Sequence, residues 1–137
     1  MVIAGRGPAE EDLRKALPEA ILLGWVDHEE LPVIYSAADL LILPSKFDTF
    51  SVAVLESLSC GLPVAAYKTK GPKDIIKHRE NGYLVTSGDD MVQSVTEYFT
   101  NRNSERSFRL AAVETAKRYA RHEILNRFLR VTGLDRE

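Results

Sequence analysis

Two acidic residues, Asp48 and Glu56, are eight positions apart, and a helix is predicted to begin between them, near Ser51. The first N–H groups of a helix have no partner within it, and the helix dipole is positive at that end. A phosphate or another anion can therefore bind there. Glu56 follows in an apolar run, where a carboxylate is costly unless a ligand or a hydrogen-bonding group meets it. A carboxylate on the solvated side of a helix start is the simpler explanation of the same spacing.

Two further polar segments follow predicted strands. Gly5, Arg6 and Gly7 come after the first apolar run of the chain, and residues 68–72 come after the fourth. Ligands of parallel α/β sheets bind where the strands end. We therefore expect both segments to lie at the same edge of the sheet as residues 45–51, with Arg6 within reach of a phosphate. An exposed arginine in a turn accounts for Arg6 equally well.

Short apolar runs alternate with helical patterns along the chain, which predicts an α/β fold. The expected strands are residues 2–5, 20–26, 40–44, 63–67 and 82–85. The expected helices are residues 9–17, 28–38, 51–60, 71–77 and 89–99. The strands are continuously apolar, which is typical of a parallel sheet with helices on both faces, as in Rossmann-like domains.

The last predicted helical segment, residues 104–132, is one long helix or two. Its apolar positions recur at spacings of three and four and are Leu110, Val113, Ala116, Ala120, Ile124 and Phe128. We expect this apolar stripe to pack on the sheet while the basic side chains face water. A basic amphipathic helix can also lie on a membrane surface, which is the alternative for this segment.

The composition is that of one folded domain. The chain has 137 residues, a formal net charge of −2, 45% hydrophobic and 28% charged residues, which excludes bulk disorder and a disulfide scaffold. Because there is no basic excess, no nucleic-acid partner is expected. Cys60 and the scattered histidines form no metal-ligand spacing, so no metal is expected. No apolar run approaches the roughly 20 residues that span a bilayer, and the expected location is the cytoplasm.

Residues 47–64 contain a specific motif, in which Asp48, seven further residues and Glu56 open a helix that ends in Gly61-Leu62-Pro63-Val64. This segment resembles the signature of the retaining, nucleotide-sugar-dependent GT-B glycosyltransferases of the glycosyl transferases group 1 family. Other segments resemble the same family in the same order. They are Gly5-x-Gly7-Pro8, Gly24-Trp25-Val26, Ala38-Asp39-Leu40, Pro44-Ser45, residues 71–76 and residues 81–85.

The resemblance implies a role for each matched residue of the motif. Glu56 matches the acidic residue that binds the ribose hydroxyls of the nucleotide, and a carboxylate is well suited to accept two hydroxyls. Asp48 matches an acidic residue, usually Glu, that faces the donor sugar near the reacting carbon, so Asp48 is the candidate catalytic residue. The backbone N–H groups of Phe50, Ser51 and Val52 match those that meet the sugar hydroxyls and the diphosphate.

The resemblance also implies donor-binding positions near the first two strands. Val26 matches a position where backbone groups meet the base, and Gly5 matches the floor of the site near the phosphates. Arg6, beside Gly5, completes the set of candidate donor-binding residues. The implied substrate is a UDP-, GDP- or ADP-linked sugar, and the resemblance implies neither a cofactor nor a metal in the site.

In this family two Rossmann-like domains form the GT-B fold, and the reaction takes place between them. Residues 1–137 are therefore expected to be a single nucleotide-sugar-binding domain, N-terminally truncated relative to the family. The acceptor-binding N-terminal domain is expected to be absent from these residues, as are the Arg and Lys that in this family neutralise the departing diphosphate. The chain alone is expected to be inactive. The intact enzyme would transfer a hexosyl group to a glycan or a lipid-linked acceptor in polysaccharide biosynthesis, with a peripheral contact at the inner face of the membrane as an option.

Two other functions remain open. The chain could be a stand-alone nucleotide-binding subunit that needs a partner chain. It could also belong to another enzyme with the GT-B fold, such as a nucleotide-sugar epimerase or a phosphorylase, because a fold alone does not define a reaction. The segment from Asp48 to Val64 favours the transferase.

Overall fold

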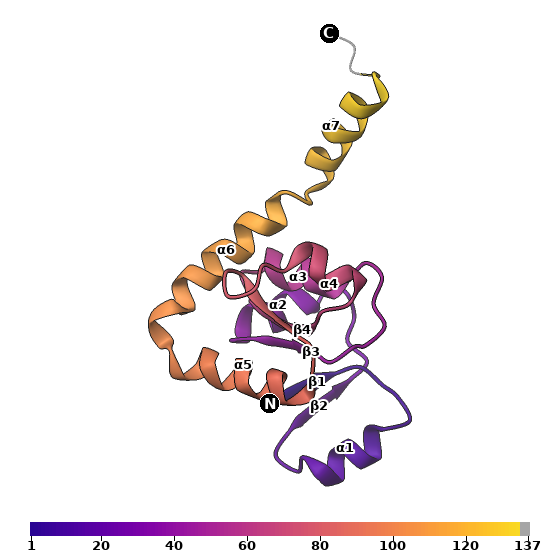
Figure 1. Ribbon diagram of the computed structural model, residues 1–137. Helices are drawn as coiled ribbons and strands as arrows, with labels where there is room; N and C mark the ends of the chain where they lie inside the picture. The colour runs from indigo at the N-terminus through magenta and orange to yellow at the C-terminus, as the bar shows by residue number, and fades with distance from the viewer. Residues whose placement is uncertain (135–137) are drawn as a thin grey trace. The chain divides into compact units, whose positions relative to one another are not determined.

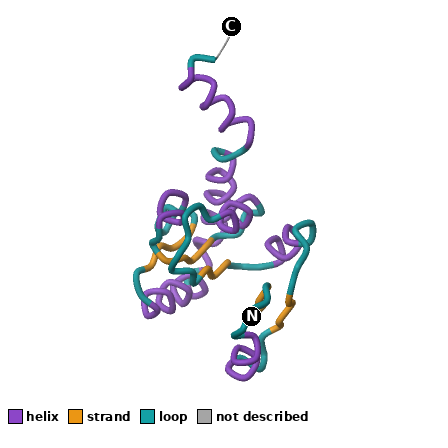
Figure 2. The backbone as a smooth tube through the Cα atoms, turned by 90° about the vertical axis from the view of Figure 1, so that its right-hand side faces the viewer, coloured by secondary structure: helices purple, strands orange, loops and turns teal. Residues whose placement is uncertain are grey.

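The computed structural model describes residues 1–134, apart from the side chain of Arg102. Strands and helices alternate along this part of the chain, as Figure 2 shows, and the predicted α/β class is confirmed. The chain divides into two compact units, unit 1 (residues 1–34) and unit 2 (residue 35 onward). The helix α2 (Leu31–Ala37) crosses the division.

Unit 1 contains two parallel strands and the helix that connects them. β1 (Val2–Ala4) pairs with β2 (Ile21–Gly24), and α1 (Glu10–Ala16) lies between them in the sequence. None of the residues 1–34 is buried, and Trp25, directly after β2, is 72% exposed. The prediction that every strand is covered on both faces is therefore wrong for β1 and β2, because unit 1 has no second layer of elements to cover them.

Unit 2 contains three parallel strands in the order β3-β4-β5, namely β3 (Leu41–Leu43), β4 (Val64–Tyr67) and β5 (Gly82–Val85). The described strands thus pair in two sheets, whereas the alternation predicted one. The remaining helices are α3 (Val52–Ser59), α4 (Lys70–Ile75), α5 (Gly88–Thr100), the short 3-10 helix η1 (Arg102–Ser104), α6 (Glu105–Lys117) and α7 (Arg121–Thr132). In Figure 1, α3 and α4 lie above β3 and β4, and α5 lies below them.

Helices cover both faces of the sheet in unit 2, as predicted. Side chains alternate along β4, so Val64 and Ala66 belong to one buried cluster and Ala65 belongs to the other. The first cluster also contains Val54, Leu58, Ile75, Ile76 and Ala112. The second also contains Tyr83, Val85, Met91, Tyr98 and Phe108. β4 therefore packs against buried side chains on both faces, and this packing fixes the strand ends that precede the loops after β3 and β4.

A buried amide joins the start of β5 to α6. Asn81 is fully buried, and its Nδ2 donates to Thr115 Oγ1 (2.8 Å) and to the Ile75 carbonyl (3.3 Å). Its Oδ1 accepts a hydrogen bond from the backbone N–H of Lys77 (2.8 Å). Because a buried polar group without partners is destabilising, this network fixes α6 on the sheet.

The segment after residue 104 forms two helices, and its buried face differs from the prediction. Leu110 is 60% exposed, whereas Phe108, Ala112 and Thr115 are the buried residues of α6. Phe108 stacks on Tyr83 with 5.4 Å between ring centroids, and Thr115 bonds the buried amide. The apolar residues on either face of α6 recur at similar spacing, and the contacts with Tyr83 and Asn81 determine which face is buried. α7 has no buried residue, so the expectation that it packs on the sheet is wrong.

Candidate functional site

The carboxylate of Asp48 closes the loop between β3 and α3. Its Oδ1 accepts hydrogen bonds from the backbone N–H groups of Ser51 (2.8 Å) and Phe50 (3.2 Å), and its Oδ2 accepts from the Ser51 hydroxyl (2.7 Å). Asp residues commonly bond the backbone of the next two or three residues in this way. Two of the three N–H groups that were predicted to meet a ligand, those of Phe50 and Ser51, are therefore bonded to the chain's own carboxylate.

Gly71, in α4, packs directly against this loop. Its N–H donates to the Asp48 carbonyl (3.1 Å). A Cβ atom at this position would lie 2.8 Å from the backbone nitrogen of Ser51 and 2.9 Å from that of Phe50. The loops after β3 and β4 therefore meet at the carboxyl edge of the sheet in unit 2, as predicted for these two loops, and their close approach requires glycine.

Glu56 lies in the second turn of α3, where it contacts α2. It is partly buried, and its Oε2 accepts a hydrogen bond from the hydroxyl of Tyr35 (3.3 Å). Val52, four positions earlier and on the same side of the helix, is 58% exposed. Tyr35 thus supplies the partner that a carboxylate in an apolar run requires, while this side of α3 still reaches solvent.

The electrostatics of Tyr35 reflect this contact. Burial and, after it, the charge and hydrogen bond of Glu56 raise the pKa of Tyr35 from 10.0 to about 12, with a smaller contribution from Cys60. Tyr35 therefore stays protonated at neutral pH and acts as a donor to the carboxylate. The Glu56 carboxylate is therefore an acceptor whose orientation is set by Tyr35 of α2.

The free energy of unfolding is expected to fall as the pH rises from 10 to 12. The pKa of Tyr35 is higher in the folded chain than its ordinary value, so its contribution to stability is complete below the ordinary value and is lost as the pH rises through the raised one. Urea unfolding at a series of alkaline pH values should show a shallower decline for Tyr35→Phe than for the wild type. Equal declines in the two chains would contradict the Tyr35–Glu56 contact.

A pair of variants tests how the loop before α3 depends on Asp48. Asp48→Asn keeps an Oδ1 acceptor for the N–H groups of Ser51 and Phe50, so the loss in unfolding free energy should be below about 1 kcal/mol. Asp48→Ala removes the acceptor and should cost about 1–2 kcal/mol. Urea unfolding of both variants measures the difference. A larger loss for the asparagine variant than for the alanine variant would contradict these hydrogen bonds.

The structure gathers five predicted site residues in unit 2, namely Asp48, Phe50, Ser51, Val52 and Glu56. The other three, Gly5, Arg6 and Val26, belong to unit 1. Gly5 has a left-handed φ of +120°, and its N–H donates to the Gly24 carbonyl (2.7 Å). The Arg6 side chain lies over Gly24, whose added Cβ would be 3.3 Å from Arg6 Nε. Gly5 and Arg6 follow β1 in a turn, as expected, whereas Val26, which was predicted within a strand, lies two residues after the end of β2.

Tyr35 is the site residue that the sequence patterns did not reveal. The available signal was a polar aromatic residue within the largely apolar segment 31–38, followed later in the sequence by a carboxylate that needed a partner. Among residues 1–134, no three His, Cys, Asp or Glu side chains are grouped so that they could hold a metal ion. In the same part of the chain, no helix combines the length and the apolar content that crossing a membrane requires.

A sequence profile of the family described as glycosyl transferases group 1 matches residues 1–115. The chain belongs to this family. The match spans unit 1 and most of unit 2, and it includes every residue that the sequence predicted for the site. The resemblance of the Asp48–Val64 segment to group 1 glycosyltransferases is thereby confirmed.

The curated relatives of this group 1 chain include named glycosyltransferases. A GDP-mannose-dependent alpha-mannosyltransferase of Corynebacterium glutamicum is 36% identical over 85 residues, which are 62% of this chain and 21% of that protein. The sulfoquinovosyl transferase of Arabidopsis thaliana is 33% identical over 122 residues, 84% of this chain and 24% of that protein. The chain spans between 21% and 33% of the length of such relatives.

Solved structures of GT-B glycosyltransferases share the fold of this group 1 chain. Sucrose-phosphate synthase from Thermosynechococcus elongatus gives a TM-score of 0.81 at 21% identity, over 98% of this chain and 39% of that one. The pneumococcal O-GlcNAc transferase GtfA, solved in complex with UDP and GlcNAc, gives a TM-score of 0.77 at 23% identity, over 95% of this chain and 28% of that one. At this level of identity the likeness concerns the fold.

Proposed function

We propose that this chain is the donor-binding part of a retaining glycosyltransferase and that it binds a nucleotide sugar at α3 and the loop before it. The observation that carries the proposal is the position of Glu56, a partly buried carboxylate held by Tyr35 one turn after the exposed start of α3. Membership of the glycosyl transferases group 1 family supports it. The donor would be a UDP-, GDP- or ADP-linked hexose.

In this proposal Glu56 accepts the ribose hydroxyls of the nucleotide. An ionised carboxylate has about four acceptor sites, so it can bind the Tyr35 hydroxyl and ribose hydroxyls at the same time. Hydrogen bonds from hydroxyls to a charged acceptor are stronger than hydrogen bonds between neutral groups. Because Tyr35 fixes the orientation of the carboxylate, little rotational freedom is lost when a ligand binds.

Asp48 and the first N–H groups of α3 would hold the sugar and the diphosphate. The N–H groups of Phe50 and Ser51 already donate to Asp48, so a donor that uses them has to compete with the Asp48 carboxylate. Val52 is the first residue of α3, and its N–H group has no partner within the helix. The proposal therefore places the diphosphate nearest to Val52 and the sugar nearest to Asp48.

The rest of the reaction would depend on other parts of the intact protein. Loss of a nucleoside diphosphate requires positive charge near the departing oxygen. Because the curated relatives are several times longer than this chain, we infer that an acceptor-binding domain and these cations lie outside residues 1–137. The acceptor would be a glycan or a lipid-linked glycan, and the chain alone would not turn over.

α7 is the segment proposed for a peripheral membrane contact of the intact enzyme. Phe128 is 57% exposed and Val131 is 83% exposed, while Arg121 and Arg127 add positive charge to the same helix. Apolar and basic side chains together favour an anionic lipid surface. Co-sedimentation with phosphatidylglycerol vesicles but not with phosphatidylcholine vesicles, lost in Phe128→Asp, is the expected result. Equal sedimentation of the Phe128→Asp variant would contradict this contact.

Calorimetric titration of UDP, GDP and ADP into three chains tests donor binding. The chains are the wild type, Glu56→Gln and Glu114→Gln, a control in which an exposed glutamate on α6 loses its ion pair with Lys117. At least one nucleotide should bind the wild type and the control with equal affinity, and Glu56→Gln should bind about tenfold or more weakly. Failure of all three nucleotides to bind, or equal binding by Glu56→Gln, would contradict the proposal.

A further inference from the structure

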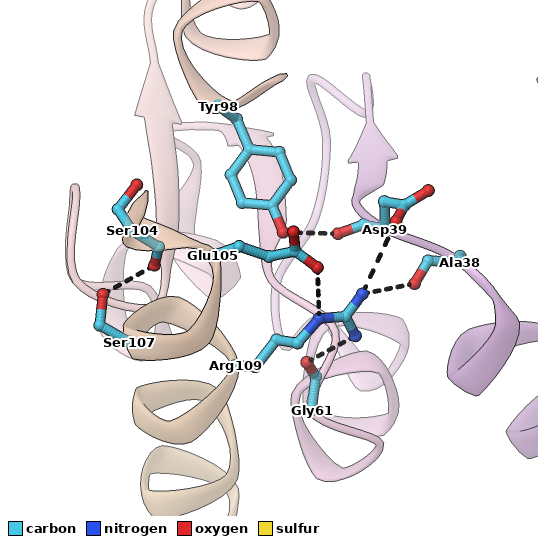
Figure 3. Close-up of polar contacts among 8 residues, drawn as sticks. All are labelled: Ala38, Asp39, Gly61, Tyr98, Ser104, Glu105, Ser107 and Arg109. Atoms are coloured by element: carbon cyan, nitrogen blue, oxygen red, sulfur yellow. Dashed lines mark hydrogen bonds and ion pairs between the residues drawn. The ribbon is translucent and has the colours of Figure 1, made fainter. Parts of the chain in front are cut away.

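Arg109, on α6, reaches two other segments of unit 2, the turn after α2 and the turn after α3 (Figure 3). Its Nη2 donates to the Ala38 carbonyl (3.1 Å) and lies 3.8 Å from Asp39 Oδ1. Its Nη1 donates to the Gly61 carbonyl (3.5 Å), and its Nε donates to Glu105 Oε1 (3.2 Å) on its own helix. One guanidinium thus binds backbone carbonyls that follow two different helices, α2 and α3.

The two carbonyls belong to the segments that continue from the Tyr35–Glu56 pair. Ala38 lies three residues after Tyr35, and its N–H donates to the Tyr35 carbonyl (3.3 Å). Gly61 follows Cys60, whose N–H donates to the Glu56 carbonyl (3.2 Å). Each carbonyl is therefore linked by one backbone hydrogen bond to the turn that ends on a residue of the pair. If the Ala38 carbonyl moves, Tyr35 is expected to move with it, and the Gly61 carbonyl is coupled to Glu56 in the same way.

The surroundings of Arg109 favour a fixed geometry. The last carbonyls of a helix are partially negative and attract a cation, and the guanidinium is a rigid fork that can bind two acceptors at once. Tyr98 donates to the Asp39 carbonyl (2.9 Å), so the turn after α2 is held by a second group. Glu105 holds the guanidinium in place from the previous turn of α6.

We propose that Arg109 is a positioning residue that sets the separation of α2 and α3, and thereby holds Tyr35 in contact with Glu56. Its effect on ligand binding rests on the proposed function. The contact between Tyr35 and Glu56 does not, because it can be measured in the chain by itself. Arg109 acts through these two residues and touches neither of them.

The first test follows the Tyr35 hydroxyl by carbon NMR of tyrosine labelled at Cζ, with Tyr35→Phe used to assign its signal. In Arg109→Ala the pKa of Tyr35 should fall from about 12 toward 10.0 at temperatures well below unfolding. Arg109→Lys keeps the charge but lacks the rigid fork that binds two carbonyls at once, so it should give an intermediate value. Arg106→Ala removes the same charge from an exposed position of α6 and should leave the value unchanged.

If Arg109 has a merely structural role, Arg109→Ala will have a lower melting temperature, but the pKa of Tyr35 in its folded state will equal the wild-type value. That result would overturn the proposal. If Arg109→Ala does not fold, Arg109→Lys decides by the same measurement. The second readout is the affinity for whichever nucleotide the wild type binds, which should fall about tenfold in Arg109→Ala and remain unchanged in Arg106→Ala. If no nucleotide binds the wild type, the proposed function fails, and the pKa of Tyr35 alone decides the role of Arg109.

Discussion

Replacing Gly82 with alanine is expected to lower the unfolding free energy by about 3 kcal/mol or more, or to prevent folding of unit 2. Gly82 opens β5 and pairs with Val64 of β4. An added Cβ would overlap the carbonyl oxygen of Val64 and lie 3.2 Å from the Ile76 side chain. Val64 is fully buried, and β4 lies between two clusters of buried side chains, so β4 cannot move aside without breaking the parallel ladder.

Gly88→Ala is the matched control for this substitution. Gly88 is the first residue of α5, and an added Cβ would lie 3.9 Å from the Tyr67 hydroxyl, which is ordinary contact. Its unfolding free energy should stay within about 0.5 kcal/mol of the wild type, or rise slightly because alanine restricts the unfolded chain. Urea unfolding compares the two variants. If Gly82→Ala is as stable as Gly88→Ala, the close packing of β4 on β5 is contradicted.

Replacing Gly71 with alanine should displace the loop that carries Asp48 and cost about 1–3 kcal/mol. The added methyl group would press on the backbone nitrogens of Ser51 and Phe50, at 2.8 and 2.9 Å, and on Asp48 Oδ1 at 3.1 Å. These are the atoms joined by the hydrogen bonds of the loop. Hydrogen exchange of the Phe50 and Ser51 amides should therefore become faster in Gly71→Ala.

Gly7→Ala provides the comparison for Gly71→Ala, since nothing lies within 4 Å of a Cβ added at Gly7. Its stability and its amide exchange in the loop should match those of the wild type. The same pair of variants also connects structure with the proposed function, because a displaced loop should bind nucleotide more weakly. Unchanged exchange at Phe50 and Ser51 in Gly71→Ala would show that the loops after β3 and β4 are not in close contact.

Local sequence patterns predicted the elements of unit 2 well. The strand 82–85 has the predicted bounds, and α3 differs from the prediction by one residue at each end. One limit of each segment is marked by a glycine, since Gly82 begins the strand and Gly61 lies two residues after α3 with a left-handed φ of +72°. The predicted strand 20–26 was too long, because Gly24 has a left-handed φ of +66° and ends β2.

Contacts between distant residues could not be predicted from the same patterns. Tyr35 is 21 residues before Glu56, and only a hydrogen bond formed in the folded chain joins them. The prediction of which face of α6 is buried was wrong, because the row that contains Leu110 and the row that contains Phe108 have the same helical spacing. Contacts with Tyr83 and Asn81 bury the row of Phe108. The start of α3 was predicted to within one residue, but the sequence could not show that Asp48 accepts hydrogen bonds from the N–H groups of Phe50 and Ser51.

Binding of the ribose hydroxyls of a nucleotide by Glu56 is the central claim. The most direct measurement compares the affinity of the wild type and of Glu56→Gln for the nucleoside diphosphate that binds and for its dideoxy analogue. We predict that the wild type binds the dideoxy analogue about tenfold or more weakly and that Glu56→Gln makes little distinction between the two ligands. Equal affinity of the wild type for both ligands, or a full distinction retained by Glu56→Gln, would contradict the claim.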